Sequence, residues 1–174
     1  LEVERFDRKG VSGRSGMVSL EAVSAEFGGG NSNWFATAQQ LRRNKIITAP
    51  TLEKIEQIYA FGKLIANSDM HQGNLSFIDP AIDPLKQSLT MSPVYDMLPM
   101  AFAPTNAGAM RREAAPLTLD PLVSKAKWLN ALAWAQEFWR KVQNDAAISL
   151  EFRQLASEML AQVEGLTGPV QRLA

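Results

Sequence analysis

The stretch Asn67-Ser68-Asp69-Met70-His71-Gln72-Gly73-Asn74 is a mostly polar run between two apolar segments. Before it, from Pro50 to about Asn67, apolar residues recur at the spacing of a helix with a buried face. After it, Leu75-Ser76-Phe77-Ile78 has the composition of a short strand. The pattern predicts a polar loop that is delivered by a buried helix and continued by a strand.

A second strand is expected to return along the first. Two prolines enforce a turn after Ile78, and residues 89–95 have the composition of a strand, with Pro93 where no ladder donor is needed. In an antiparallel hairpin the start of the first strand lies near the end of the second. We therefore expect Asn74 and Asp96 at the same end of the hairpin, close enough to share a metal ion.

These positions carry a chemical pattern. Asp69 precedes Asn74 by the spacing seen in the catalytic loop of protein kinases, where the Asp accepts the substrate hydroxyl proton and the Asn holds Mg²⁺. Asp96 supplies a second hard oxygen ligand. A simpler account is that these residues only favour turns. His71 is expected to order the loop by bonding backbone carbonyls.

The fold class predicted from the whole chain is mainly α with a small β-hairpin, in a single domain over residues 1–174. Residues 1–8 alternate like a strand, and residues 9–18 have the glycine-rich composition of a loop. Residues 100–119 look irregular. The stretch from Met97 to Met110 lies where kinases keep the activation segment, although a packed loop is the simpler interpretation.

Helix starts are indicated by capping residues. Ser19 and Ser149 are suited to the position before a helix, and Asp120-Pro121 combines a capping residue with a first-turn proline. The predicted helices cover about 20–27, 32–44, 50–67, 120–144 and 149–168. The last two are expected to form a helical bundle over about 120–168.

Composition excludes several classes of protein. Lys and Arg number 18 and Asp and Glu number 18, so the formal net charge of +0 argues against a dedicated binder of nucleic acid or anionic membranes. We interpret the small basic cluster at Arg111-Arg112 as a solvated surface. Cysteine is absent and His71 is the single histidine, which excludes disulfides and multi-histidine metal sites and favours a reducing, cytoplasmic location. No apolar run is long enough to span a bilayer.

Three segments resemble the HipA family of bacterial serine/threonine kinase toxins. The segment Leu1-Glu2-Val3-Glu4-Arg5-Phe6-Asp7-Arg8 is similar to the hinge strand of that family. The segment from Leu64 to Phe77 is similar to its D-x-H-x-x-N-x-S catalytic loop, and the segment from Leu89 to Met97, which includes Tyr95-Asp96, to its metal-binding segment. The three occur in the order of the family and anchor residues 1 to about 98.

The resemblance implies the C-terminal lobe of a kinase-like fold, with ATP and Mg²⁺ as cofactors. Asp69 would be the catalytic base, and His71 would order the catalytic loop. Asn74 and Asp96 would bind the metal. In the hinge segment, Glu4 and Phe6 would meet adenine, and Asp7 would lie close to the nucleotide.

The resemblance also implies partners. Family members phosphorylate a protein Ser or Thr, in some cases on an aminoacyl-tRNA synthetase, and many are held by a DNA-binding antitoxin. Direct contact with nucleic acid or a membrane is not expected. The family's Gly-rich phosphate loop and ATP-pairing lysine precede the hinge strand. Because Leu1 already lies in that strand, we expect this chain to lack the ATP-gripping lobe and to have negligible kinase activity alone.

Two other functions stay open on the residues alone. A metal-dependent nuclease or phosphodiesterase would use Asp69 and Asp96 as metal ligands, but it would want further carboxylates such as Asp79 and Asp83, which the hairpin places at its opposite end. A non-catalytic module that only binds an antitoxin would not need the intact set of Asp69, Asn74 and Asp96.

Overall fold

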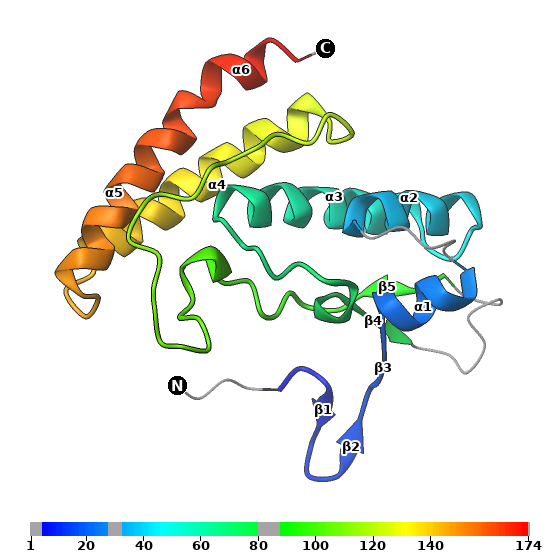
Figure 1. Cartoon of the computed structure of the whole chain (residues 1–174). Helices are drawn as coiled ribbons and strands as arrows, with labels where there is room; N and C mark the ends of the chain where they lie inside the picture. Colours follow the sequence, from blue (N-terminus) through cyan, green and yellow to red (C-terminus); the bar gives the residue numbers. More distant parts are fainter. Residues whose placement is uncertain (1–4, 28–32, 80–87, 174) are drawn as a thin grey trace. The chain divides into compact units, whose positions relative to one another are not determined.

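The computed structural model describes residues 5–27, 33–79 and 88–173 (Figure 1). The chain forms two compact units. The sheet unit comprises Leu1–Ile55 and Met70–Asp96, and the helical unit comprises Glu56–Asp69 and Met97–Ala174. Helices make up most of the regular structure, and the strands form two small antiparallel sheets. Among the described residues, no helix has both the length and the apolarity needed to cross a bilayer.

The sheet unit is built on three antiparallel strands in the order β3-β4-β5, which are Gly16–Ser19, Ser76–Asp79 and Thr90–Met91. The predicted hairpin is present, with Phe77 opposite Met91 and Ile78 opposite Thr90. Its second strand is much shorter than the predicted range 89–95, because Pro93 has no N–H to extend the ladder. Phe77 is fully buried and anchors the centre of the sheet.

The first residues of the chain differ from the prediction. Strands β1 (Arg8–Lys9) and β2 (Gly13–Arg14) form a separate small hairpin, and a turn occupies Phe6-Asp7. The predicted strand over residues 1–8 is therefore wrong from Arg5 to Asp7 and confirmed at Arg8; residues 1–4 lie outside the described residues. The loop predicted over 9–18 is confirmed only as the turn between β1 and β2, because strand β3 gains its hydrogen bonds from a distant partner, β4.

Two short helices follow strand β3 in the same unit. Helix α1 (Leu20–Phe27) begins as predicted, with Ser19 Oγ accepting from the amide of Ala22 at 3.2 Å. Helix α2 (Trp34–Arg43) is capped by Asn33, whose side chain accepts from two first-turn amides. These caps satisfy backbone donors that a helix start leaves unpaired.

The helical unit contains the second part of α3 (Ala49–Leu64) together with α4 (Lys125–Asn144), α5 (Leu150–Gly165), α6 (Thr167–Gln171) and a 3-10 turn, η2, at Met100–Phe102. Helices α4 and α5 lie side by side (Figure 1). Trp128, Trp139 and Met159 are fully buried among them. Burial of such large side chains supplies a substantial share of the stability of a small domain.

Ser149 caps α5 as predicted, but the predicted start of α4 at Asp120-Pro121 is wrong. The Asp120 carboxylate accepts from the Leu122 amide at 2.9 Å and from the Tyr59 hydroxyl at 2.9 Å. Because these donors hold Asp120 in a turn, the helix begins only at Lys125. The short helix α6 was not predicted.

Helix α3 ends before the candidate site in a defined C-cap. The amide of Asn67 donates to the carbonyl of Gly62 at 2.9 Å, and that of Ala66 to the carbonyl of Lys63 at 3.3 Å. Ala66 has φ +56°, so the pattern is a Schellman motif with alanine where glycine is usual. The carbonyl of Leu64 is satisfied by the buried Trp139 Nε1 at 3.1 Å. The direction in which the chain leaves the helix is thereby fixed.

Candidate active site

Asn67 holds the backbone of Asp69 within the helical unit. The Asn67 side chain is almost fully buried, and its Oδ1 accepts from the amide of Asp69 at 2.9 Å. Its Nδ2 contacts Met97 Sδ at 3.5 Å. This is an Asx turn directly after the cap of α3. It leaves the Asp69 side chain half-buried at the start of the loop.

The rest of the loop, from Met70 to Asn74, belongs to the sheet unit, where side chains of α1 and α2 bond to it. Trp34 Nε1 from α2 donates to the carbonyl of His71 at 2.8 Å. The side-chain amide of Gln72 donates to Thr37 Oγ1 at 3.0 Å, and its oxygen accepts from the Ser24 hydroxyl of α1. The loop is therefore anchored on two sides before it reaches Asn74, in a short 3-10 turn, η1 (Gln72–Asn74).

His71 contacts this loop through one ring nitrogen. Its Nδ1 accepts from the amide of Gly73 at 3.0 Å, a bond to a backbone donor that the expected bonds to backbone carbonyls did not include. Acceptance at Nδ1 requires that nitrogen to be unprotonated. A Cβ at Gly73 would lie 2.8 Å from His71 Cε1, so the absence of a side chain there lets the ring approach its own loop.

Tyr95 joins the loop to the segment that carries Asp96. Its hydroxyl donates to the carbonyl of Gly73 at 3.0 Å. Because that uses the single hydroxyl proton, the 2.6 Å contact with Ser76 has the serine as donor. The amide of Ser92 also donates to the carbonyl of Ser76 at 2.9 Å, beyond the last strand pair. These bonds bring the backbones that precede Asn74 and Asp96 to the same end of β4.

The donor set at this end of β4 suits a hard cation. Asn74 offers an amide oxygen and Asp96 a carboxylate, which are ligand types that Mg²⁺ accepts together with water and phosphate oxygens. Asp96 is exposed and has φ +54°, a left-handed conformation that Asp tolerates better than most residues. Over the described ranges, no three His, Cys, Asp or Glu side chains gather as a metal cluster. Asp79 ends β4 on the other side, and Asp83 lies outside the described residues.

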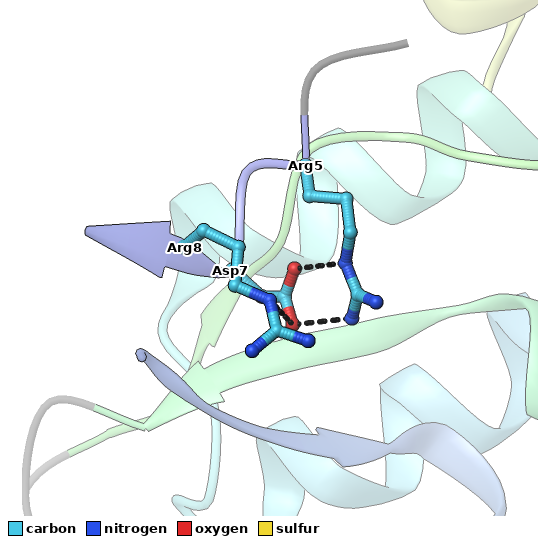
Figure 2. Close-up of polar contacts among 3 residues, drawn as sticks. All are labelled: Arg5, Asp7 and Arg8. Carbon is cyan, nitrogen blue, oxygen red and sulfur yellow. Dashed lines mark hydrogen bonds and ion pairs between the residues drawn. The ribbon is translucent and has the colours of Figure 1, made fainter. Parts of the chain in front are cut away.

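The predicted nucleotide-facing residues lie in the first segment of the sheet unit. Phe6 stacks on Tyr95, with ring centroids 6.1 Å apart and an interplanar angle of 29°. Figure 2 shows the Asp7 carboxylate between two arginines: it accepts from Arg5 at 2.9 and 2.7 Å, and Arg8 lies 3.8 Å away. Hydrogen bonding from Arg5 lowers the pKa of Asp7. Glu4 lies outside the described residues.

Sequence reasoning selected the chemical groups but missed the residues that position them. Asn67, Trp34 and Tyr95 were not singled out as site residues. The pattern Asn67-Ser68-Asp69 is itself a signal for an Asx turn. Tyr95 lies in the segment that resembles the family's metal-binding segment, but no local pattern predicts its contact or that of Trp34, because their hydrogen-bond partners lie 22 and 37 positions away in the sequence.

Comparison with known proteins identifies related sequences. The model of the family described as HipA-like C-terminal domain matches residues 1–166. The chain is 44% identical over 173 residues to the protein named Toxin YjjJ from Escherichia coli (strain K12). The match covers 99% of this chain and 38% of the length of that relative. The chain therefore spans well under half the length of this relative.

Proposed function

We propose a kinase function from one premise: this chain belongs to the HipA-like C-terminal domain family. In this proposal the chain is the catalytic-loop lobe of a serine/threonine protein kinase that acts as a toxin of a toxin–antitoxin system. The related Escherichia coli protein is named Toxin YjjJ. The reaction would transfer the γ-phosphate of ATP to a hydroxyl of a protein substrate.

The roles follow from the chemistry of the side chains. Asp69 would accept the proton of the attacking hydroxyl, from a backbone position held by Asn67. Asn74 and Asp96 would hold Mg²⁺, which when bound neutralises charge on the phosphates. His71 would act as a positioning residue through its bond to Gly73. Phosphoryl transfer depends mainly on positioning and charge, so a loop held on several sides suits it.

The observation that carries this proposal is the hydrogen bond from Tyr95 to the carbonyl of Gly73. It ties the residue before Asp96 to the residue before Asn74, as sharing one metal ion requires. The exposed Asp96, beside the stacked pair of Phe6 and Tyr95, would face the nucleotide side of the lobe. Glu4, Phe6 and Asp7 would line the adenine side.

Other parts of the full-length protein would complete the nucleotide site. The chain spans 38% of the length of Toxin YjjJ, and this share leaves room for an ATP-gripping lobe elsewhere. The substrate would be a protein, with an aminoacyl-tRNA synthetase as one candidate, and a DNA-binding antitoxin would be the regulator. We expect this lobe alone to have negligible activity.

The test is transfer of ³²P from ATP by the full-length protein, as wild type and as Asp69→Ala. Loss of labelling in the variant, with unchanged thermal unfolding, supports Asp69 as base. Glu137→Ala is a matched control, because this exposed acid lies on α4 in the helical unit, which also contains Asp69. Labelling that survives Asp69→Ala at the wild-type rate would refute the assignment.

The two alternatives predict different results in the same experiment. A metal-dependent nuclease would cleave DNA and would label no protein. It would also want a third carboxylate, and the described residues bring no such cluster together. A non-catalytic antitoxin-binding module would bind its partner equally well as wild type and as Asp69→Ala, and neither would label protein.

A further inference from the structure

A hollow of about 190 Å³ lies in the helical unit beside the turn that precedes Asp69. It is lined by the end of α3 and the turn, by η2 and by the segment after Met110. Its lining residues are Lys63, Ala66, Asn67, Ser68, Ala101, Arg111, Ala115, Pro116 and Thr118. The candidate base and this hollow thus share one structural element, the turn built by Asn67.

The charge of the hollow has one sign. Lys63 and Arg111 line it, and none of its lining residues is acidic. In the part of the chain that the structure describes, neither cation forms an ion pair or a hydrogen bond through its side chain. Asn67, Ser68 and Thr118 add polar groups. A concave site with two unpaired cations and several polar groups is suited to an anionic group.

The neighbouring hollow, of about 500 Å³, provides the contrast. Arg111 also lines that hollow, but there it is accompanied by Arg112 and by two acids of α5, Glu151 and Glu158. Its charge is therefore mixed. Arg112 lines the larger hollow but not the smaller one, although it is the basic residue next to Arg111 in the chain.

We propose that Lys63 and Arg111 form a specificity site for an anionic side chain of the protein substrate, next to the accepting Ser or Thr. The inference rests on the proposed kinase function, since that function places the acceptor hydroxyl at Asp69. Ser68 lines the hollow and is adjacent to Asp69 in the chain, with Cα atoms about 3.8 Å apart. An extended peptide advances about 3.3–3.6 Å per residue, so the anion belongs within about three positions of the acceptor.

The shared chemistry of the ligand is a carboxylate or a phosphorylated side chain. Both bind Lys and Arg through charge-assisted hydrogen bonds. A nucleic-acid backbone is the less favoured source, because the chain has a formal net charge of +0 and two cations make only a small footprint. The hollow has room for one side chain of the substrate, so it sets no limit on the length of the substrate peptide.

The experiment measures binding of fluorescent peptides to the full-length protein by anisotropy. Each peptide has one Ser acceptor, and the set places Asp, phosphoserine or Asn at each of the three positions on either side. We expect one position at which Asp or phosphoserine strengthens binding about tenfold or more over Asn, as hydrogen bonds to charged groups allow. Arg111→Gln and Lys63→Gln should reduce that ratio to below about threefold, and Arg112→Gln should leave it unchanged.

The other outcomes are also informative. Comparison of the affinities of the Asp and phosphoserine peptides shows whether the site prefers a carboxylate or a phosphorylated side chain. Binding of inorganic phosphate with no preference among peptides, or an equal loss in Arg112→Gln, overturns the proposal. The proposal is also overturned if an oligonucleotide binds the wild-type protein as tightly as the acidic peptides do and this binding is lost in Arg111→Gln. If the acidic preference is present while ³²P transfer from ATP is absent, the kinase function fails and the anion site stands. If transfer occurs without an acidic preference, the kinase function stands and this site fails.

Discussion

The hydroxyl of Tyr95 donates a 3.0 Å hydrogen bond to the carbonyl oxygen of Gly73, 22 positions earlier in the chain. The same hydroxyl accepts from Ser76 on β4. A single side chain therefore fixes the register between the loop that contains Asn74 and the segment that contains Asp96. The two strands of the hairpin contribute only two residue pairs from β5, so this bond adds a constraint that the short ladder lacks.

Tyr95→Phe should loosen that connection. The substitution keeps the ring that stacks on Phe6 but leaves the Gly73 carbonyl without its donor, which should lower the free energy of unfolding by about 1–2 kcal/mol. Phosphate transfer by the full-length protein should fall further than this stability loss explains. Urea denaturation and the ³²P assay provide the two measurements.

Tyr59→Phe is the matched control for that prediction. The Tyr59 hydroxyl bonds the Asp120 carboxylate at 2.9 Å in the helical unit. Its loss should cost a similar free energy of unfolding, with little change in transfer. Equal falls in transfer for the two variants would show that Tyr95 acts only through stability.

Sequence patterns predicted those parts of the fold that single residues determine. Ser19 and Ser149 each cap a helix because a serine oxygen satisfies a first-turn amide wherever the rest of the chain lies. Strand β3 was missed because a four-residue segment that begins with glycine becomes a strand only through its partner β4. The same limit explains Asp120, whose carboxylate is engaged by a tyrosine 61 positions away.

The same distinction, between features set by local residues and features set by distant partners, applies to the candidate site. The spacing of Asp69 and Asn74, and the hairpin that leads to Asp96, are visible in the sequence. The groups that position them are not, since Trp34 and Tyr95 act on the loop from distant segments. Even His71, which was expected to order the loop, uses a ring nitrogen as acceptor, a choice that only the loop geometry determines.

Asp96→Asn should separate the metal role of this residue from its structural role. Asp96 has φ +54°, and Asn tolerates that left-handed conformation, so the free energy of unfolding should change by less than about 0.5 kcal/mol. The proposed Mg²⁺ affinity in the presence of ATP should fall by about tenfold or more, because loss of even an outer-sphere partner has effects of that size. Calorimetric titration of the full-length protein measures it. Asp79→Asn, at the other end of β4, should bind Mg²⁺ like wild type, and a matching fall there would contradict the assignment.

Arg5→Gln should raise the pKa of Asp7. Hydrogen bonding from the Arg5 guanidinium lowers that pKa, and the charges of Arg5 and Arg8 act in the same direction. Because the folded-state pKa is depressed, the contribution to stability is present above the unfolded-state pKa of about 4 and is lost as the pH falls through the folded value. Titration of the Asp7 carboxyl ¹³C resonance should show the shift toward its ordinary range in Arg5→Gln. Arg14→Gln, on strand β2, should leave the titration unchanged, and a curve for Arg5→Gln that overlies wild type would rule out the arginine as cause.

Gly73→Ala should destabilise the loop only while His71 is present. A Cβ at position 73 would lie 2.8 and 2.9 Å from the His71 ring atoms Cε1 and Nδ1. The His71 side chain is exposed, so the ring can swing away, but it then loses the bond from the Gly73 amide, at a cost of about 0.5–1.5 kcal/mol. In a His71→Ala background the same substitution should cost almost nothing, since no ring remains to be displaced. Urea denaturation of the two single variants and the double variant gives the coupling free energy directly. A cost for Gly73→Ala that is the same in both backgrounds would mean that the glycine serves the backbone or Glu21, whose carboxylate lies 3.6 Å from the added carbon, and not the histidine.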